Sequence, residues 1–273
     1  MKVLKKDKIL EQGQFEHTMT ERAILAQVNS PFVVDMQFAF QTEDKLYLIM
    51  EFVSGGELFT YIQLQKEKTG NYLDEVAIAF YAAEIVVALE HIHSQNIVYR
   101  DLKPENILVD GEGHIKLSDF GLSKVTEAGE DLTFTVCGTP EYVAPEIVEN
   151  EGHNKNIDWW SLGVLLFEMY TGQTPFHQMP IQTIFEKLKS PSNISLRRLR
   201  SASKEFQNLV QGLLSKDPEQ RLGSSNGAAD VMAHPFFNGL PWDVVRRREL
   251  CAPLKPTLTK KDDTRMFDVH YLN

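Results

Sequence analysis

Tyr99-Arg100-Asp101-Leu102-Lys103-Pro104-Glu105-Asn106, followed by Asp119-Phe120-Gly121, is the stretch that decides the fold of this 273-residue chain. Between the two segments, residues 107–109 and 114–117 are short apolar runs joined by the turn Asp110-Gly111-Glu112-Gly113, a pattern typical of a β-hairpin. Such a hairpin would bring the side-chain oxygens of Asn106 and Asp119 together as ligands for Mg²⁺. Asp101, just upstream, would then orient a hydroxyl nucleophile, so the spacing indicates a site for phosphoryl transfer.

Composition limits the class of protein. The chain is 42% hydrophobic and 24% charged, which supports a folded core. Its formal net charge of −10 disfavours nucleic acid as the main partner. The two cysteines, Cys137 and Cys251, form no CxxC pair, so we expect neither a disulfide framework nor a zinc site, and a cytoplasmic or nuclear location. The longest apolar stretch, residues 159–170, is too short to cross a bilayer, so we expect no membrane insertion.

The predicted elements are strands first and helices later. We expect a strand ending at residues 3–4, a helix at 18–28, strands at 33–40 and 46–52, and helices at 57–65, 73–94, 158–170, 181–189, 204–215 and 228–233. Asp158 is expected to cap the 158–170 helix at its N-terminus. This order predicts an α+β fold with a small β-rich lobe and a larger helical lobe, which meet near residues 54–56.

The motifs as a set resemble those of protein kinases. Residues 99–106 resemble the catalytic loop of protein kinases, and we use that name for them below. The family's other motifs follow in the typical order, over essentially the whole chain: Asp119-Phe120-Gly121, Ala144-Pro145-Glu146, Asp158-Trp159-Trp160 and Arg221. Tyr99 and the run Cys137-Gly138-Thr139-Pro140-Glu141-Tyr142 resemble the AGC group of serine/threonine kinases. Residues 38–42 and 55–60 are most similar to the N-terminal kinase domain of mitogen- and stress-activated kinases.

This resemblance implies a bilobal protein-kinase-like fold that uses ATP and Mg²⁺. It would have an incomplete small β lobe at 1–53, a larger helical lobe at 54–250 and the start of the AGC C-terminal tail at 251–273. Asp101 would receive the proton of the substrate hydroxyl, Lys103 would stabilise charge on the transferring phosphate, and Asn106 and Asp119 would hold Mg²⁺. The positions implied to bind or support ATP are Lys2, Glu21, Glu51, Val53, Leu108 and Phe267. Glu146 and Arg221 would form a buried ion pair.

The resemblance also implies regulation and substrate choice. Thr135 would be phosphorylated by an upstream activating kinase, and His17, Arg100 and Lys124 would receive the phosphate. Glu57, Glu105 and Glu168 would pair with arginines upstream of the target residue, which predicts basic protein substrates. An apolar pocket for the residue after the target would include Val136, Pro140 and Val143, and Thr139 would select serine or threonine over tyrosine.

The printed sequence departs from the family pattern in two respects: no GxGxxG motif occurs in it, and only the opening of the AGC tail follows the helical lobe. We therefore expect a domain truncated at both ends, without the Gly-rich loop that covers the phosphates, and with impaired activity. A non-catalytic scaffold that binds protein partners remains the main alternative. A small-molecule kinase is the third, although Thr139-Pro140-Glu141-Tyr142 argues against it. Lys2 and Glu21 could also be ordinary surface charges.

Overall fold

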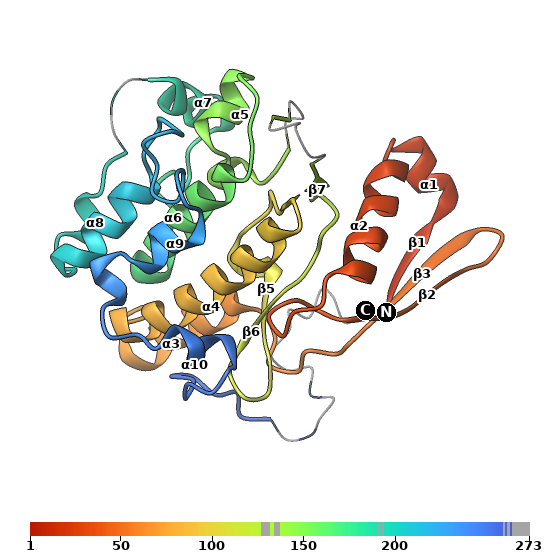
Figure 1. Cartoon of the computed structure of the whole chain (residues 1–273), viewed down its shortest axis with the longest axis horizontal. Coiled ribbons are helices and arrows are strands. Elements are labelled where there is room, and N and C mark those ends of the chain that lie inside the picture. The colour runs from red at the N-terminus through yellow and green to blue at the C-terminus, as the bar shows by residue number, and fades with distance from the viewer. Residues whose placement is uncertain are drawn as a thin grey trace.

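The computed structural model describes residues 1–126, 132–133, 137–190, 192, 194–258, 260 and 263. It has two parts, a small sheet with two helices and a larger helical body (Figure 1). The sheet contains β1 (Lys2–Lys5), β2 (Met36–Gln41) and β3 (Lys45–Met50) in the order β1-β3-β2, with both pairings antiparallel. The helices α1 (Lys6–Glu11) and α2 (Phe15–Gln27) pack with it.

The helical body is built around two long apolar helices, α4 (Glu75–Ser94) and α6 (Asn156–Thr171), most of whose residues are buried. Asp74 caps α4, because its carboxylate accepts a hydrogen bond from the Ala77 N–H at 2.8 Å. α4 is long and apolar enough to span a membrane, but 78% of its apolar stretch is buried inside the protein, as expected of a core helix. Around these two helices lie α3 (Leu58–Thr69), α5 (Pro145–Glu149), α7 (Ile181–Lys189), α8 (Lys204–Leu213), α9 (Ala228–Met232) and α10 (Trp242–Arg246).

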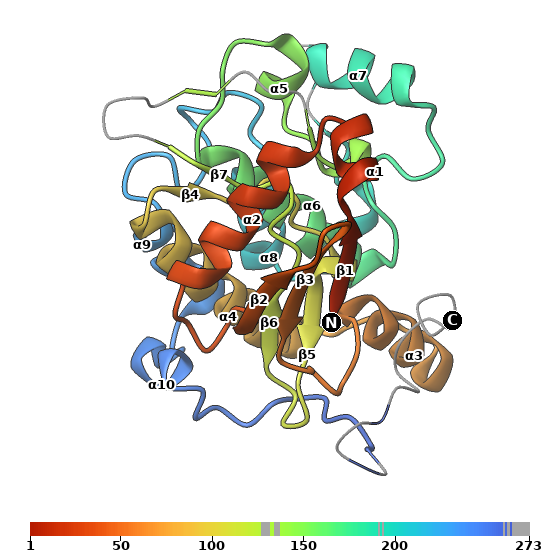
Figure 2. The ribbon, with the colours of Figure 1, turned by 90° about the vertical axis from the view of Figure 1, so that its right-hand side faces the viewer.

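A short hairpin lies between the two parts, as Figures 1 and 2 both show. It consists of β5 (Ile107–Val109) and β6 (Ile115–Leu117), paired antiparallel with Ile107 opposite Leu117, so the predicted hairpin is confirmed. β6 also contacts the segment that leads from α2 to β2, because Leu117 N–H donates to Phe32 O at 2.8 Å and Val34 N–H donates to Leu117 O at 2.9 Å. The hairpin is therefore bonded to both parts of the molecule. A second pair, β4 (Ile97–Val98) and β7 (Lys124–Val125), follows α4.

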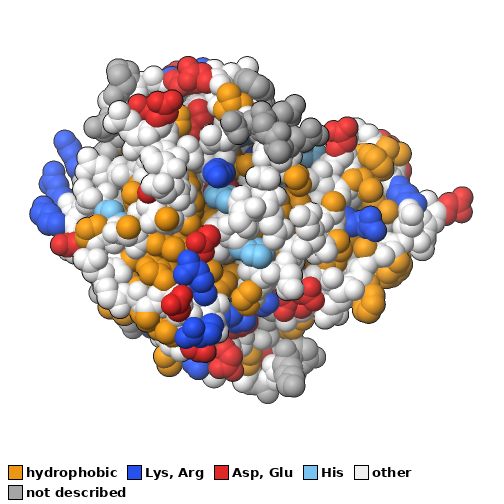
Figure 3. Space-filling view, in the orientation of Figure 1, with side chains coloured by type: hydrophobic (Ala, Val, Ile, Leu, Met, Phe, Trp, Pro, Cys, Tyr) orange, Lys and Arg blue, Asp and Glu red, His pale blue; other side chains and the backbone are white. Residues whose placement is uncertain are grey.

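Most exposed large hydrophobic side chains lie in the first 52 residues. Figure 3 shows hydrophobic side chains gathered on the face of the small part, over its helices and strands. The residues concerned are Met1, Val3, Leu10, Phe15, Met19, Phe38, Phe40 and Phe52. The small part is thus the less completely buried of the two.

The predicted α+β class is confirmed, while several element bounds were wrong. α1 was not predicted, because its only buried residue is Ile9 and so it leaves no apolar period in the sequence. α2 begins at Phe15 instead of residue 18, and α3 continues to Thr69 beyond the predicted residue 65. The predicted boundaries at residues 53 and 250 stay predictions.

Candidate active site

Asp101, Lys103 and Thr139 form a closed triangle of polar contacts. Lys103 Nζ lies 2.9 Å from Asp101 Oδ2 and donates to Thr139 Oγ1 at 2.9 Å. The Thr139 hydroxyl donates in turn to Asp101 Oδ1 at 3.0 Å. Asp101 is only 7% exposed, so its carboxylate is held in one orientation by charged and neutral donors. A carboxylate held in this way is suited to orient a hydroxyl group and to accept its proton.

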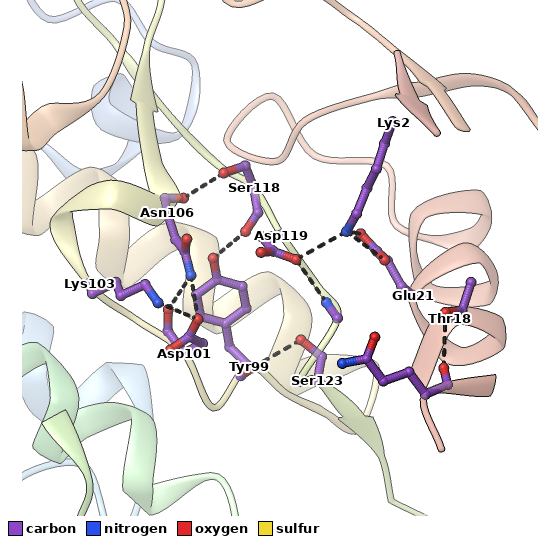
Figure 4. A network of polar contacts seen from close by, with 12 residues as sticks. Lys2, Thr18, Glu21, Tyr99, Asp101, Lys103, Asn106, Ser118, Asp119 and Ser123 are labelled. Atoms are coloured by element: carbon purple, nitrogen blue, oxygen red, sulfur yellow. Dashed lines mark hydrogen bonds and ion pairs between the residues drawn. The ribbon is translucent and has the colours of Figure 1, made fainter. Parts of the chain in front are cut away.

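The side-chain amide of Asn106 is fixed in orientation by the catalytic loop. Its Nδ2 donates to the Asp101 carbonyl at 2.9 Å and to Asp101 Oδ2 at 2.7 Å. The backbone carbonyl oxygen of Asn106 accepts hydrogen bonds from the Ser118 N–H at 2.9 Å and from the Ser118 hydroxyl at 3.0 Å. The two bonds made by Nδ2 use the donor end of the side-chain amide, so Oδ1 is the atom that could bind a ligand. The bonds from Ser118 place Asn106 beside the residue that precedes Asp119 (Figure 4).

Asp119 has a left-handed backbone, with φ of 52°. Such a conformation costs energy for a residue other than glycine and occurs often at functional sites. Its side chain is 53% exposed; Oδ1 accepts from the Gly121 N–H at 3.3 Å and lies 3.5 Å from Lys2 Nζ. The carboxylate therefore faces the space between the two parts of the molecule.

Lys2 and Glu21 form an ion pair across the small part, with Lys2 Nζ 2.7 Å from Glu21 Oε1 and 2.9 Å from Oε2. Burial acts to lower the pKa of Lys2, but the carboxylates of Glu21 and Asp119 more than offset it, so the pKa is raised. Lys2 is therefore a firmly charged ammonium group between two carboxylates, one on α2 and one at the end of the hairpin (Figure 4). Its position joins α2 to the catalytic hairpin.

A fully buried carboxylate, Asp158, holds the backbone of the catalytic loop. Asp158 Oδ2 accepts from the Tyr99 N–H at 2.9 Å, Oδ1 accepts from the Arg100 N–H at 2.8 Å, and His93 Nε2 lies 2.7 Å from Oδ2. The prediction that Asp158 caps its own helix was wrong, because α6 begins two residues earlier, at Asn156. Asp158 instead fixes the strand-to-loop turn that delivers Asp101.

The residues expected near adenine lie where the chain passes from β3 toward α3. The Glu51 N–H donates to Asp35 O at 2.9 Å, and the Glu51 side chain accepts from Lys116 Nζ at 2.6 Å. Among the described residues, the N–H of Val53 donates to no backbone carbonyl. Leu108 is half-buried and bridges to Glu57 through its backbone. Phe267 lies outside the described residues.

An acidic cluster lies on the other side of the catalytic loop. Burial raises the pKa of Glu168 to about 7, and the nearby carboxylates of Glu105 and Glu141 raise it as well. The hydroxyl of Tyr142 donates to Glu168. Glu105 and Glu168 were predicted to bind substrate, whereas Glu141 and Tyr142 were missed, although both follow Pro140 directly in the sequence. Glu57, the third predicted substrate-binding acid, does not act on the pKa of Glu168; it lies at the N-terminus of α3.

The remaining substrate-side predictions are only partly described. Thr139 and Pro140 are half-buried beside the catalytic loop, and Val143 is buried. Val136 and the predicted phosphorylation site Thr135 lie outside the described residues.

Two of the three predicted phosphate-binding side chains lie in one electrostatic neighbourhood. Burial lowers the pKa of His153 to about 4, and the positive charges of Arg100 and Lys124 lower it further. Arg100 and Lys124 therefore both lie near His153. Arg100 is 6% exposed, and its Nη1 has no partner among the described residues. His17 is half-buried on α2, with no hydrogen bond or ion pair to Arg100 or Lys124 in the described part of the chain.

A contact that the sequence did not predict fastens the segment after the hairpin. Thr133 and His153 exchange two backbone hydrogen bonds of 2.8 Å, and Thr133 Oγ1 lies 2.7 Å from His153 Nε2. Both residues are almost fully buried. The low pKa keeps His153 neutral, which suits this hydrogen bond to a hydroxyl.

The donor set fits Mg²⁺ bound together with phosphate, and does not fit a metal bound by protein alone. Asn106 would supply one amide oxygen and Asp119 would supply carboxylate oxygens. Among the described residues, no group of three or more His, Cys, Asp or Glu side chains is placed to hold a metal ion. Mg²⁺ usually keeps waters and phosphate oxygens beside one or two protein ligands.

Comparison with known proteins agrees with this geometry. The family model described as "Protein kinase domain" matches residues 1–237. Protein kinase 2 of Dictyostelium discoideum is 46% identical over 268 residues, which cover 98% of this chain and 54% of that protein. Serine/threonine-protein kinase gad8 of Schizosaccharomyces pombe is 44% identical over 276 residues (99% and 46%), and ribosomal protein S6 kinase 2 alpha of Gallus gallus is 46% identical over 275 residues (99% and 35%). The chain thus spans about half, or less, of the length of these curated relatives.

Proposed function

This chain belongs to the protein kinase domain family, in its AGC group, and we propose that it transfers the γ-phosphate of ATP to serine or threonine hydroxyls of proteins. The observation that carries the proposal is the pair of contacts made by Lys2, to Glu21 at 2.7 Å and to Asp119 at 3.5 Å. In active protein kinases the strand lysine is paired with the helix glutamate while the metal-binding aspartate is in place. The Lys2–Glu21 ion pair, with Asp119 beside it, supports the proposal that this chain can adopt that arrangement.

The catalytic loop supplies the groups that act on the nucleophile. Asp101 orients the substrate hydroxyl and accepts its proton as the bond to phosphorus forms. Lys103, 2.9 Å from both Asp101 Oδ2 and Thr139 Oγ1, places an ammonium charge beside the phosphoryl group in transit. Asn106 and Asp119 would hold Mg²⁺, which would neutralise the negative charge that develops during the transfer. Most of the catalysis then comes from positioning and electrostatics.

The acidic cluster supports basic proteins as substrates. Glu105, Glu141 and Glu168 lie close enough together to perturb the pKa of Glu168. A guanidinium group inserted among them would relieve this repulsion and would form charge-assisted hydrogen bonds. We therefore assign arginine upstream of the target serine or threonine as the preferred feature of the substrate.

The cationic groups near His153 support activation by phosphorylation. Arg100 has a buried Nη1 without a described partner, and Lys124 lies nearby on β7. A phosphate on Thr135, added by an upstream kinase, would bring about −1.5 to −2 units of charge and strong acceptors for these donors. The expected result is that Thr135→Ala and Arg100→Ala both lose activation by the upstream kinase. Full activation of either variant would exclude this regulation.

The decisive experiment measures Mg²⁺-dependent ATP binding and transfer of labelled γ-phosphate to an arginine-containing serine peptide. Wild-type protein is compared with Asp101→Asn and Asp119→Ala, and circular dichroism verifies that all three are folded. We expect Asp101→Asn to bind ATP without transferring phosphate, and Asp119→Ala to lose Mg²⁺-dependent binding. The scaffold alternative, which the lack of a GxGxxG motif in the printed sequence favours, predicts no Mg²⁺-dependent binding by any of the three proteins.

A further inference from the structure

The turn of the β5–β6 hairpin is held from outside by residues far away in the sequence. We propose that Asp110, Arg248 and Glu84 are positioning residues, which act through the hairpin on its metal-binding end. The inference rests on the proposed function, because it concerns where Asn106 and Asp119 are held. Neither of these two side chains touches Arg248. The link between them is the hairpin itself.

Asp110 closes the turn and also bears the external contact. Its Oδ1 accepts hydrogen bonds from the N–H groups of Glu112 at 2.9 Å and His114 at 3.0 Å. The backbone N–H of Asp110 donates to His114 O at 2.8 Å. Its other oxygen, Oδ2, forms an ion pair with Nη2 of Arg248. One carboxylate therefore couples the shape of the turn to the segment that follows α10.

Glu84 of α4 holds the same turn from the inner side. It is 1% exposed; Oε2 accepts from the Ile115 N–H at 2.9 Å, and Oε1 lies 2.5 Å from His114 Nδ1. A buried carboxylate that binds the first backbone N–H of β6 and the ring nitrogen of the residue before it fixes the start of this strand against α4. The turn is thus held on two sides by two acids.

Arg248 also contacts Phe32, in the segment between α2 and β2. Its guanidinium carbon lies 5.9 Å from the centre of the Phe32 ring. Phe32 O accepts the Leu117 N–H at 2.8 Å, so the ring belongs to the segment bonded along β6. Arg248 adopts a left-handed backbone with φ of 58°, a conformation that a bulky residue adopts only where its surroundings compensate the cost.

The chain after α10 passes directly against the turn, as Figures 1 and 2 both show. A Cβ atom built on Gly113 would lie 2.5 Å from Leu254 O and 2.6 Å from the Ala252 Cβ. Only glycine fits there. The hairpin tip is therefore enclosed by α4, by Arg248 and by residues 252–254.

A small tilt at the tip moves the opposite end, because each strand is only three residues long. Ile107 pairs with Leu117, and the next residues outward are Asn106 and Ser118, followed by Asp119. A displacement of about 1 Å at a catalytic site can cost on the order of a hundredfold in rate. Arg248 and Asp110 thereby influence the metal ligands without touching them.

Arg246, the last residue of α10 and two positions before Arg248, offers a control whose ion pair is more exposed. Arg246 forms an ion pair with Glu90 of α4 at 2.9 Å, so it also joins the α10 region to α4, but it does not touch the hairpin. Arg246→Gln removes a comparable arginine–carboxylate contact. A purely structural role for Arg248 predicts that Arg246→Gln and Arg248→Gln behave alike.

The test measures the Mg²⁺ concentration for half-maximal ATP binding, the KM for peptide, and hydrogen exchange of the hairpin amides without ligand. We expect Arg248→Gln to raise the Mg²⁺ requirement about tenfold, the lower end of the effect seen for residues that bond to metal ligands directly, because Arg248 acts only through the hairpin. The peptide KM should stay within twofold, and exchange at residues 107–109 and 115–117 should accelerate. Arg246→Gln should change none of the three.

Two further variants guard against simple unfolding. Asp110→Asn keeps an acceptor for the turn N–H groups but loses the charge that Arg248 binds, and should reproduce the effect of Arg248→Gln. The double variant should be no worse than the stronger single one. Equal behaviour of Arg246→Gln and Arg248→Gln, or an unchanged Mg²⁺ requirement in Arg248→Gln, would overturn the inference alone. Wild-type protein without Mg²⁺-dependent ATP binding would overturn the proposed function and this inference with it.

Discussion

Arg221 and Glu146 form a buried, bidentate ion pair, with distances of 2.6 Å from Nη1 to Oε1 and 2.9 Å from Nη2 to Oε2. Arg221 also donates to the carbonyl oxygens of Ser215 and Asn156 at 3.0 Å, and the centre of the Trp160 ring lies 5.4 Å from its guanidinium carbon. The pair joins α5, which follows the Thr139–Val143 segment, to the loop after α8. It therefore fixes this segment to the core of the helical body.

Removing one partner of this pair should be strongly destabilising. Arg221→Ala leaves the Glu146 carboxylate buried without its counter-charge, which costs about 3–5 kcal/mol of unfolding free energy. Urea denaturation followed by tryptophan fluorescence measures the loss. The control is Arg247→Ala, which removes an exposed pair with Glu249 and should leave the midpoint unchanged. A loss below about 1 kcal/mol in Arg221→Ala would contradict the argument.

Neutralising Lys2 should impair chemistry more than folding. Lys2→Met keeps the length of the side chain but removes the charge shared by Glu21 and Asp119, so we expect a decrease in kcat/KM of about 10²–10³-fold. Steady-state phosphotransfer at saturating peptide measures it. Lys5→Met, at an exposed position on the same strand, should retain wild-type activity. Equal losses in the two variants would show that the ion pair is not the cause.

Recognition of arginine should depend on pH through Glu168. Its pKa in the folded protein is about 7, so the carboxyl loses its proton between pH 6 and pH 8 and becomes able to bind a guanidinium. The KM for an arginine-containing peptide should fall as the pH rises over this range. In Glu168→Gln, and for a peptide in which alanine replaces arginine, this part of the pH dependence should disappear.

A rise in pH should strengthen peptide binding through Glu168, but it should lower the stability of the folded protein through the same residue. The ordinary pKa of a glutamate is 4.5, and the folded value of Glu168 is higher, so folding favours the protonated form. Its contribution to stability is complete below pH 4.5 and is lost as the pH rises through about 7. Comparing the unfolding free energies of wild type and Glu168→Gln at pH 4.5 and pH 7.5 measures this. The variant should gain relative to wild type at the higher pH, and an unchanged difference would contradict the sign.

Contact between the hairpin turn and the C-terminal segment can be tested with alanine at two glycines. Gly113 and Gly70 have positive φ values of 93° and 77°, but a Cβ on Gly70 meets nothing within 4 Å. Backbone strain alone costs Gly70→Ala about 1–2 kcal/mol. Gly113→Ala must also displace the Leu254 carbonyl, so it should lose about 1–3 kcal/mol more in urea denaturation. Equal losses would mean that the segment moves freely.

The parts of the site that sequence could predict are those fixed by local spacing. Two apolar runs around a glycine-rich turn suffice to place Asn106 and Asp119 at one end of a hairpin. The Glu146–Arg221 pair was predicted because the resemblance supplied a partner 75 positions away. For Asp110 and Arg248 neither spacing nor resemblance named a partner, and their contact depends on how α10 packs. α1 was missed for a related reason, since a six-residue helix with one buried side chain gives no periodic signal.

The 138 positions between Asp110 and Arg248 also order events during synthesis. A ribosome that adds about 5–20 residues per second needs roughly 7–28 s to travel from one to the other, and the exit tunnel delays the second further. During that interval Glu84 of α4, which holds the turn from the inner side, has already been synthesised, whereas Arg248 has not yet been translated. The contact between Asp110 and Arg248 therefore forms only after Arg248 has been translated, and until then the hairpin turn stays open to chaperones.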